Sequence, residues 1–224
     1  MTLPPGVEPV PWDSAVFGVK AFEITIVSGE TLAWAVRNPG HYTVRLDPLA
    51  SKQLLHEYGF YYCDTLVEPF CKVDRFIGFD DPAVFAKKGT MLEPLLAIGH
   101  GAFAHGRFHR DFQLPRTFAD QRYENWLVQL HRAGKVFGLF WHEELAGFIA
   151  VDGNRLVLHA VAESLRGQGL ARHLWTPVCR GVFADGWDEV VSSVSAANLP
   201  VVSLYQRLGF RLRNALDLYH RMTG

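Results

Sequence analysis

The stretch that decides the fold is SLRGQGLARHLW, residues 164–175. Before it, RLVLHAVA (155–162) alternates in the manner of a strand, and after it Leu170, Leu174 and Val178 repeat at helical spacing. Glycines allow the backbone to turn sharply and to expose successive N–H groups, and a helix start adds its positive dipole end. The stretch therefore predicts an anion site of a size suited to a pyrophosphate.

Two other phosphate-binding motifs do not fit this loop. No Gly-Lys-Ser/Thr follows it, as a Walker loop requires, and it lacks the G-x-G-x-x-G pattern with a later acidic residue. A flexible glycine loop that caps an ordinary helix explains the hexapeptide equally well. Pro177 falls inside the predicted helix and is expected to kink it.

A second signal lies downstream in NLPVVSLYQRLGF, residues 198–210. Asn198 follows a predicted strand, and its amide can offer both a donor and an acceptor to an amide-bearing ligand. Tyr205 comes seven residues later, about two helical turns on, so it can return to the same end of the fold. Taken alone, Tyr205 also fits the surface of an amphipathic helix.

The ending of this segment has a counterpart earlier in the chain. A shift of 150 positions aligns TVRLDPLASKQLLHEYGFYY with VSAANLPVVSLYQRLGFRL, and pairs Val44, Leu54, Gly59 and Phe60 with Val194, Leu204, Gly209 and Phe210. Both copies predict a strand, a helix ended by glycine, and a strand. We interpret residues 1–80 as a degenerate half-copy of the domain at 81–224. The half-copy has Leu55 where the later copy has Tyr205.

Composition limits the functional classes. The 224 residues carry a net charge of -1, with 49% hydrophobic and 13% aromatic residues, which predicts a soluble globular protein. This charge gives no support for a nucleic-acid or polybasic membrane surface. The three cysteines form no CxxC pair, and no secretory signal or membrane-length apolar run is apparent. We therefore expect a cytoplasmic protein, with a homodimer as one possible state.

The order of these features resembles the acetyl-CoA-binding core of the GNAT superfamily of N-acetyltransferases. The resemblance covers roughly 81–224 and rests on the strand, the R-G-x-G-x-A loop, the helix, the next strand, the asparagine and LYQRLGF. VEPVPWDSAVFGV, AFAHGRF and RYENWL are also similar to the TDP-fucosamine acetyltransferases of enterobacterial common antigen synthesis. The resemblance implies an α/β GNAT fold with a mixed sheet and a degenerate half-GNAT N-terminal domain.

The resemblance also implies roles for particular residues. Val161 would bind the pantetheine arm of acetyl-CoA through its backbone, and Asn198 would lie beside the cofactor. Tyr205 would protonate the departing thiolate, whose ordinary pKa of ~8.5 makes a nearby proton donor useful. Amine attack is direct, so no nucleophilic cysteine is needed. The pyrophosphate would be held by the loop residues Arg166, Gly167, Gln168, Gly169, Leu170 and Ala171.

Substrate recognition is expected from the irregular stretch 103–126. Arg107 and Arg110 could meet a diphosphate, and Tyr123 or Trp126 could stack on a sugar or base. A solvated loop with one aromatic anchor is the alternative. We predict no metal from the histidines of this region, and we assign no general base. The histidines of this region are His100, His105 and His109. His159 lies on the strand before the glycine loop, where a structural hydrogen bond would also explain it.

The function that we expect is acetyl transfer from acetyl-CoA to a small-molecule amine, namely a nucleotide-linked amino sugar of the TDP-4-amino-4,6-dideoxyhexose type. Two alternatives stay open at this stage. One is acetylation of a protein N-terminus or another small amine, and the other is a CoA-binding regulatory module without turnover. The sequence does not identify the sugar or the acyl chain.

Overall fold

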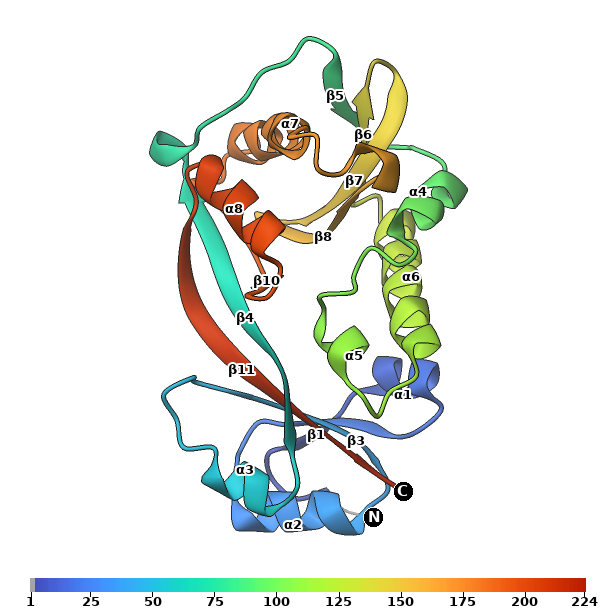
Figure 1. Cartoon of the computed structure of the whole chain (residues 1–224), viewed down its shortest axis with the longest axis vertical. Coiled ribbons are helices and arrows are strands. Elements are labelled where there is room, and N and C mark those ends of the chain that lie inside the picture. The colour runs from blue at the N-terminus through green and yellow to red at the C-terminus, as the bar shows by residue number, and fades with distance from the viewer. Residues whose placement is uncertain (1–2) are drawn as a thin grey trace. The chain divides into compact units, whose positions relative to one another are not determined.

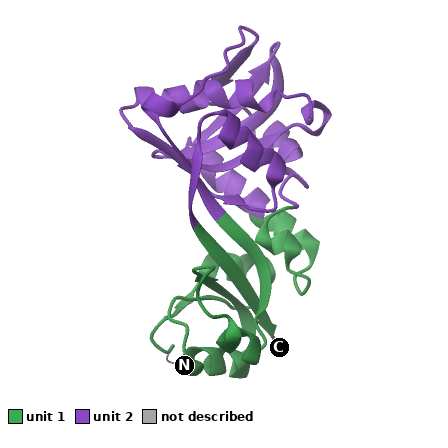
Figure 2. Cartoon of the chain, turned by 60° about the vertical axis from the view of Figure 1, so that its left-hand side comes forward, with its two compact units in different colours: residues 1–66, 105–122, 215–224 green, residues 67–104, 123–214 purple. Residues whose placement is uncertain are grey.

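The computed structural model describes residues 3–224 and divides into two compact units. Figure 2 colours them separately. Unit 1 contains residues 1–66, 105–122 and 215–224, and unit 2 contains residues 67–104 and 123–214. Three elements have one end in each unit, namely β4 (Tyr61–Lys72), α6 (Arg116–Arg132) and β11 (Arg211–Thr223). The boundary predicted near residue 80 rests on the Gly, Asp and Pro residues of the connection at 71–89 and stays a prediction.

Unit 2 is built on a mixed sheet. Its strands lie in the order β4, β9, β8, β7, β6, β5, and β8 and β9 are parallel while the other neighbours are antiparallel. A short extra strand, β10 (Val194–Ser195), pairs with β4. The predicted α/β fold with a mixed sheet is therefore confirmed. The bounds are β5 Val84–Lys87, β6 Val136–Trp141, β7 Glu144–Asp152, β8 Arg155–Val161 and β9 Glu189–Ser192.

Helices cover both faces of this sheet, as Figure 1 shows. Successive side chains of β7 alternate between the faces, so Ile149 packs with α7 and α8 while its neighbour Phe148 packs with α4 and α6. Both side chains are fully buried. The helices of this unit are α4 Leu92–Gly99, α7 Ala171–Ala184 and α8 Leu199–Arg207, with 3-10 turns at Val73–Arg75 and Glu163–Leu165.

In unit 1, β1 pairs antiparallel with β2, β2 parallel with β3, and β3 antiparallel with β11. Helix α2 begins with a capping box, in which Ser28 and Thr31 each accept the other's backbone N–H. The bounds are β1 Val7–Pro9, α1 Pro11–Phe17, β2 Ala21–Ile24, α2 Gly29–Arg37, β3 Gly40–Leu46, α3 Gln53–Glu57 and α5 Arg107–Arg110. No helix within residues 3–224 is long and apolar enough to cross a membrane.

The two predicted copies end their helices in the same way. Gly59 and Gly209 both have left-handed backbone, with φ of 72° and 88°. In each copy the following phenylalanine N–H donates to the carbonyl five residues back, Phe60 to Leu55 at 2.9 Å and Phe210 to Tyr205 at 3.0 Å. The side chains of Leu55 and Tyr205 are fully buried. The local strand-helix-strand repeat is therefore present, and the half-GNAT nature of the N-terminal part stays a prediction.

A buried carboxylate organises the core of unit 1. Asp111 Oδ2 lies 3.0 Å from His41 Nε2 and 2.8 Å from His220 Nδ1. The other oxygen accepts the Tyr61 hydroxyl at 2.8 Å and the Gln113 N–H at 3.0 Å. Burial by itself would raise the pKa of Asp111, but the hydrogen bonds from His220, His41 and Tyr61 outweigh burial and hold the pKa well below its usual range.

The side chains of His41, Asp111 and His220 place their possible metal-ligand atoms within 4.8 Å of one another, which is the spacing of a possible cation site. Both rings, however, approach a single carboxylate oxygen at hydrogen-bond distance. Positive Arg107 also lies near enough to lower the pKa of His220, which burial chiefly lowers to about 3. The geometry fits a carboxylate neutralised by hydrogen-bond donors, with the 105–122 segment attached to β3 and β11 through Asp111.

We predict that Asp111→Asn lowers the free energy of unfolding by about 2 kcal/mol or more, because an amide cannot accept from all four donors that surround the carboxylate. Chemical denaturation measures the change. Asp80→Asn is the matched control, since Asp80 forms an exposed ion pair with Arg180 and such pairs contribute at most about 1 kcal/mol. Equal stability of Asp111→Asn and the native protein would contradict this role.

Candidate active site

The strands β8 and β9 separate partway along their length. They pair only at Arg155 with Val191 and at Leu156 with Ser192, although β8 continues to Val161. On its other edge β8 stays paired with β7 as far as Val161 opposite Gly147. The segment 157–161 therefore has one edge without a neighbouring strand, and backbone groups on such an edge can bind an extended ligand.

The carbonyl of Val161 has a partner in this structure. It accepts a hydrogen bond from the Nε–H of Arg166 at 2.9 Å, and the Arg166 side chain is exposed. One backbone group of Val161 is therefore occupied by the first residue of the predicted pyrophosphate loop. Binding of a pantetheine arm by the backbone of Val161 stays a prediction.

The glycine loop has the predicted geometry. Gly167 and Gly169 have left-handed φ of 76° and 75°, and a Cβ at either would meet open space. Among residues 3–224, the backbone N–H groups of 167–170 donate to no backbone carbonyl. The loop leads into α7, a helix of 14 residues whose N-terminus has no side-chain cap. N–H groups without a backbone acceptor beside an uncapped helix start can hold an anion. Pyrophosphate binding at this loop stays a prediction.

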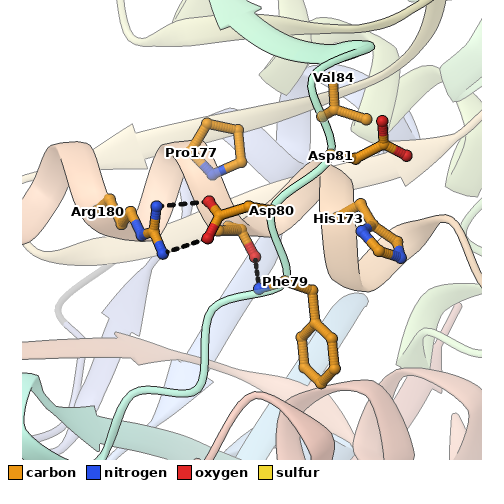
Figure 3. A pocket seen from close by; sticks show the side chains of 8 residues that line it. Phe79, Asp80, Asp81, Val84, His173, Pro177 and Arg180 are labelled. Carbon is orange, nitrogen blue, oxygen red and sulfur yellow. Dashed lines mark hydrogen bonds and ion pairs between the residues drawn. The ribbon is translucent and has the colours of Figure 1, made fainter.

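Pro177 lies inside α7 as expected, and a small cavity lies beside it. The cavity has a volume of about 150 Å³. Figure 3 shows Asp80 from the 79–84 connection reaching Arg180. The Phe79 N–H donates to the Thr176 hydroxyl at 2.9 Å. These contacts attach the connection to the helix. The lining residues are Phe79, Asp80, Asp81, Val84, His173, Thr176, Pro177 and Arg180.

Asn198 has a structural partner. It is the N-cap of α8, and its Oδ1 accepts the Val201 N–H at 3.4 Å. The oxygen therefore faces the helix that follows, and a role of Asn198 beside the cofactor stays a prediction.

Tyr205 is not on the surface of its helix. Its side chain is fully buried, and its hydroxyl lies 3.0 Å from Nε2 of His159, a residue of the unpaired part of β8. Burial raises the pKa of Tyr205, and this outweighs the hydrogen-bonding groups of Ser192 and Trp175, which lower it. The phenol therefore keeps its proton at neutral pH, as a general acid must.

The predicted substrate residues fall in different units. Arg107 and Arg110 belong to unit 1, and Tyr123 and Trp126 belong to unit 2 with the glycine loop. Arg110 Nη1 pairs with Asp64 Oδ1 at 2.7 Å. The ring of Tyr123 stacks on Phe103 at 4.5 Å, and Trp126 packs against the core around α4. These contacts give Arg110, Tyr123 and Trp126 a role within their own units. Contact of any of the four side chains with a substrate stays a prediction.

Two histidines from the same region are engaged with carboxylates. His100 Nδ1 lies 3.0 Å from Glu124 Oε1, and His109 Nε2 lies 2.8 Å from Asp120 Oδ1. The predicted absence of a metal site stays a prediction. The pairing that sequence reasoning missed is that of His159 with Tyr205. The two are 46 residues apart, and the only available signal was the position of His159 on the strand before the loop.

Comparison with known proteins agrees with this geometry. Residues 105–210 match the acetyltransferase (GNAT) family, whose acyl donor is acetyl-CoA. A GCN5-related N-acetyltransferase from Sphaerobacter thermophilus is 14% identical, with 91% of this chain and 72% of that chain covered and a TM-score of 0.63. No curated protein sequence matches the chain.

Two further solved structures share the fold. One is a GCN5-related N-acetyltransferase from Kribbella flavida, at 12% identity, 92% and 82% coverage and a TM-score of 0.57. The other is a tandem GNAT protein from the clavulanic acid biosynthesis pathway, at 11% identity, 92% and 76% coverage and a TM-score of 0.57. At such identities the structures establish the fold alone, and that fold is the GNAT fold.

Proposed function

We propose that this protein transfers the acetyl group of acetyl-CoA to the amino group of a nucleotide-linked amino sugar of the TDP-4-amino-4,6-dideoxyhexose type. The observation that carries the proposal is the combination, in one unit, of an unpaired strand edge at 157–161 with a loop of exposed N–H groups at 167–170. The edge suits the amide-bearing arm of acetyl-CoA, and the loop suits its pyrophosphate.

The chemistry needs few groups. The amine nitrogen attacks the thioester carbonyl, the C–N bond forms and the C–S bond breaks. The thiolate that leaves takes a proton, and Tyr205 supplies it in this proposal because its raised pKa keeps the phenol protonated. The three cysteines are buried, and burial raises the pKa of Cys179 in the same unit, so neither access nor charge favours a thiol nucleophile.

The sequence supports a nucleotide-linked amino sugar as the amine that receives the acetyl group. Segments near the N-terminus, at 102–108 and at 122–127 resemble the TDP-fucosamine acetyltransferases. The fold also accommodates amino-sugar acceptors, because one similar structure is described as a glucosamine N-acetyltransferase region of a fungal multi-domain β-N-acetylglucosaminidase. That match has 14% identity, a TM-score of 0.61, and coverage of 91% of this chain and 30% of that chain.

A panel of amines tests the acceptor. Release of free CoA thiol is measured with acetyl-CoA and a TDP-4-amino-4,6-dideoxyhexose, an unlinked amino sugar, peptides with free N-termini, and small amines. The proposal expects the fastest release with the nucleotide-linked sugar. Activity on peptides with none on the nucleotide sugar would overturn the acceptor, and tight CoA binding without release in any reaction would indicate a binding module.

The loop assignment predicts a charge effect on acetyl-CoA affinity. Gly167→Asp is expected to raise the dissociation constant of acetyl-CoA at least about tenfold, because a carboxylate would stand close to the pyrophosphate. Gly167→Asn has the same shape without the charge and is expected to stay within about threefold of the native value. Calorimetric titration measures both.

Gly186→Asp controls for backbone strain, because Gly186 has a left-handed φ of 94° and open space for a Cβ. Its acetyl-CoA affinity should equal that of the native protein. If Gly167→Asp and Gly167→Asn bind acetyl-CoA equally well, the loop is not the pyrophosphate site.

The proton-donor assignment predicts a kinetic effect of Tyr205→Phe. The substitution retains the buried ring and removes only the hydroxyl, so kcat is expected to fall about 100-fold or more while acetyl-CoA binding stays within about twofold. Steady-state kinetics and calorimetry supply the two values. A kcat equal to that of the native protein would leave Tyr205 with a packing role alone.

A further inference from the structure

The hydroxyl of Tyr205 has a specific partner in the segment of β8 that is no longer paired with β9. His159 Nε2 lies 3.0 Å from it. His159 sits opposite Ile149 of β7, and its own ring packs edge-on against Trp175 of α7 with centroids 5.1 Å apart. The imidazole is therefore held by a paired strand on one side and by an indole on the other, which fixes its direction.

Burial lowers the pKa of His159 to about 4, so the ring is neutral at physiological pH. One ring nitrogen then carries a proton and the other a lone pair. A phenol that keeps its O–H for the thiolate must accept from His159, and this requires the proton on Nε2, 3.0 Å from the hydroxyl.

The hydroxyl is not required for packing. In the earlier copy of the motif Leu55 fills the corresponding position and is likewise fully buried. A buried hydroxyl without a partner is destabilising, so a phenol at this position is maintained only with a hydrogen-bonding partner nearby. His159 is half-buried and lies in the segment of β8 that has no strand on its β9 side. The pair therefore stands where the ligand would run.

We propose that His159 is a positioning residue for Tyr205, whose hydroxyl it holds beside the unpaired edge of β8 so that the phenol can protonate the departing thiolate. His159 itself neither attacks nor deprotonates the substrate. The inference rests on the proposed function, because it requires that the pair serve acetyl transfer.

A double-mutant cycle tests this role, with CoA release from acetyl-CoA and the best amine of the panel as the readout. His159→Leu is expected to lower kcat about tenfold or more, since the hydroxyl loses the imidazole that holds it in place. His159→Gln, whose amide N–H can donate to the phenol oxygen, is expected to recover most of the loss. Acetyl-CoA affinity should stay within about threefold in both variants, and thermal unfolding confirms that they fold.

The decisive comparison is made in the Tyr205→Phe background. If His159 acts only through the hydroxyl, then His159→Leu has no further effect on kcat once the hydroxyl is gone. An equal fold-loss in both backgrounds would overturn the inference, because it would give His159 a role of its own. Full activity of His159→Leu would also overturn it.

The failure of the proposed function has a different signature. If the native protein releases no CoA with any amine, acetyl transfer is wrong for this chain and the positioning role is lost with it. If the native protein is active and His159→Leu equals it, only the positioning role is wrong.

Discussion

Backbone groups along a strand must find hydrogen-bond partners, and strand β8 has no neighbouring strand to supply them on one edge beyond Leu156. The parallel neighbour β9 ends at Ser192, and the chain then forms β10, which pairs with β4 instead. This separation leaves the 157–161 edge of β8 without a strand partner. The candidate site depends on it, since the loop at 166–171 follows β8 after only the short 3-10 turn at Glu163–Leu165.

Enclosed polar groups in both units are stabilised by specific partners. In unit 1 four donors surround the carboxylate of Asp111. In unit 2 the Tyr205 hydroxyl meets His159, and enclosure keeps one group a neutral phenol and the other a neutral imidazole. Burying such groups costs free energy unless each is hydrogen-bonded. The Asp111 network attaches segment 105–122 to β3 and β11. The Tyr205–His159 pair is the one for which we propose a role in acetyl transfer.

Local patterns predicted much of this structure. The strand at 155–161, the loop at 166–170 and the helix that follows were all evident from alternation, glycine spacing and helical periodicity. The glycine that ends each helix of the repeat was predicted as well, because left-handed backbone favours that residue. These features depend on neighbours within a few residues, which a sequence displays directly.

Features that depend on distant residues could not be predicted in the same way. His41, Asp111 and His220 come from three separated segments, and His159 meets Tyr205 only because β8 and α8 pack together. Asn198 was predicted to face a ligand, yet its oxygen caps a helix. Both uses draw on the same acceptor, and only the fold decides between them. The amine acceptor is set by side chains whose arrangement the sequence alone does not define.

The central claim is that acetyl-CoA lies along β8 and at the loop before α7. Amide hydrogen exchange, followed by mass spectrometry with and without acetyl-CoA, tests this location most directly because it reads the backbone N–H groups themselves. The account predicts that the cofactor slows exchange in peptides covering 157–172 and leaves peptides covering β2 and α2 of unit 1 unchanged. Slowed exchange elsewhere, with 157–172 unaffected at saturating acetyl-CoA, would contradict it.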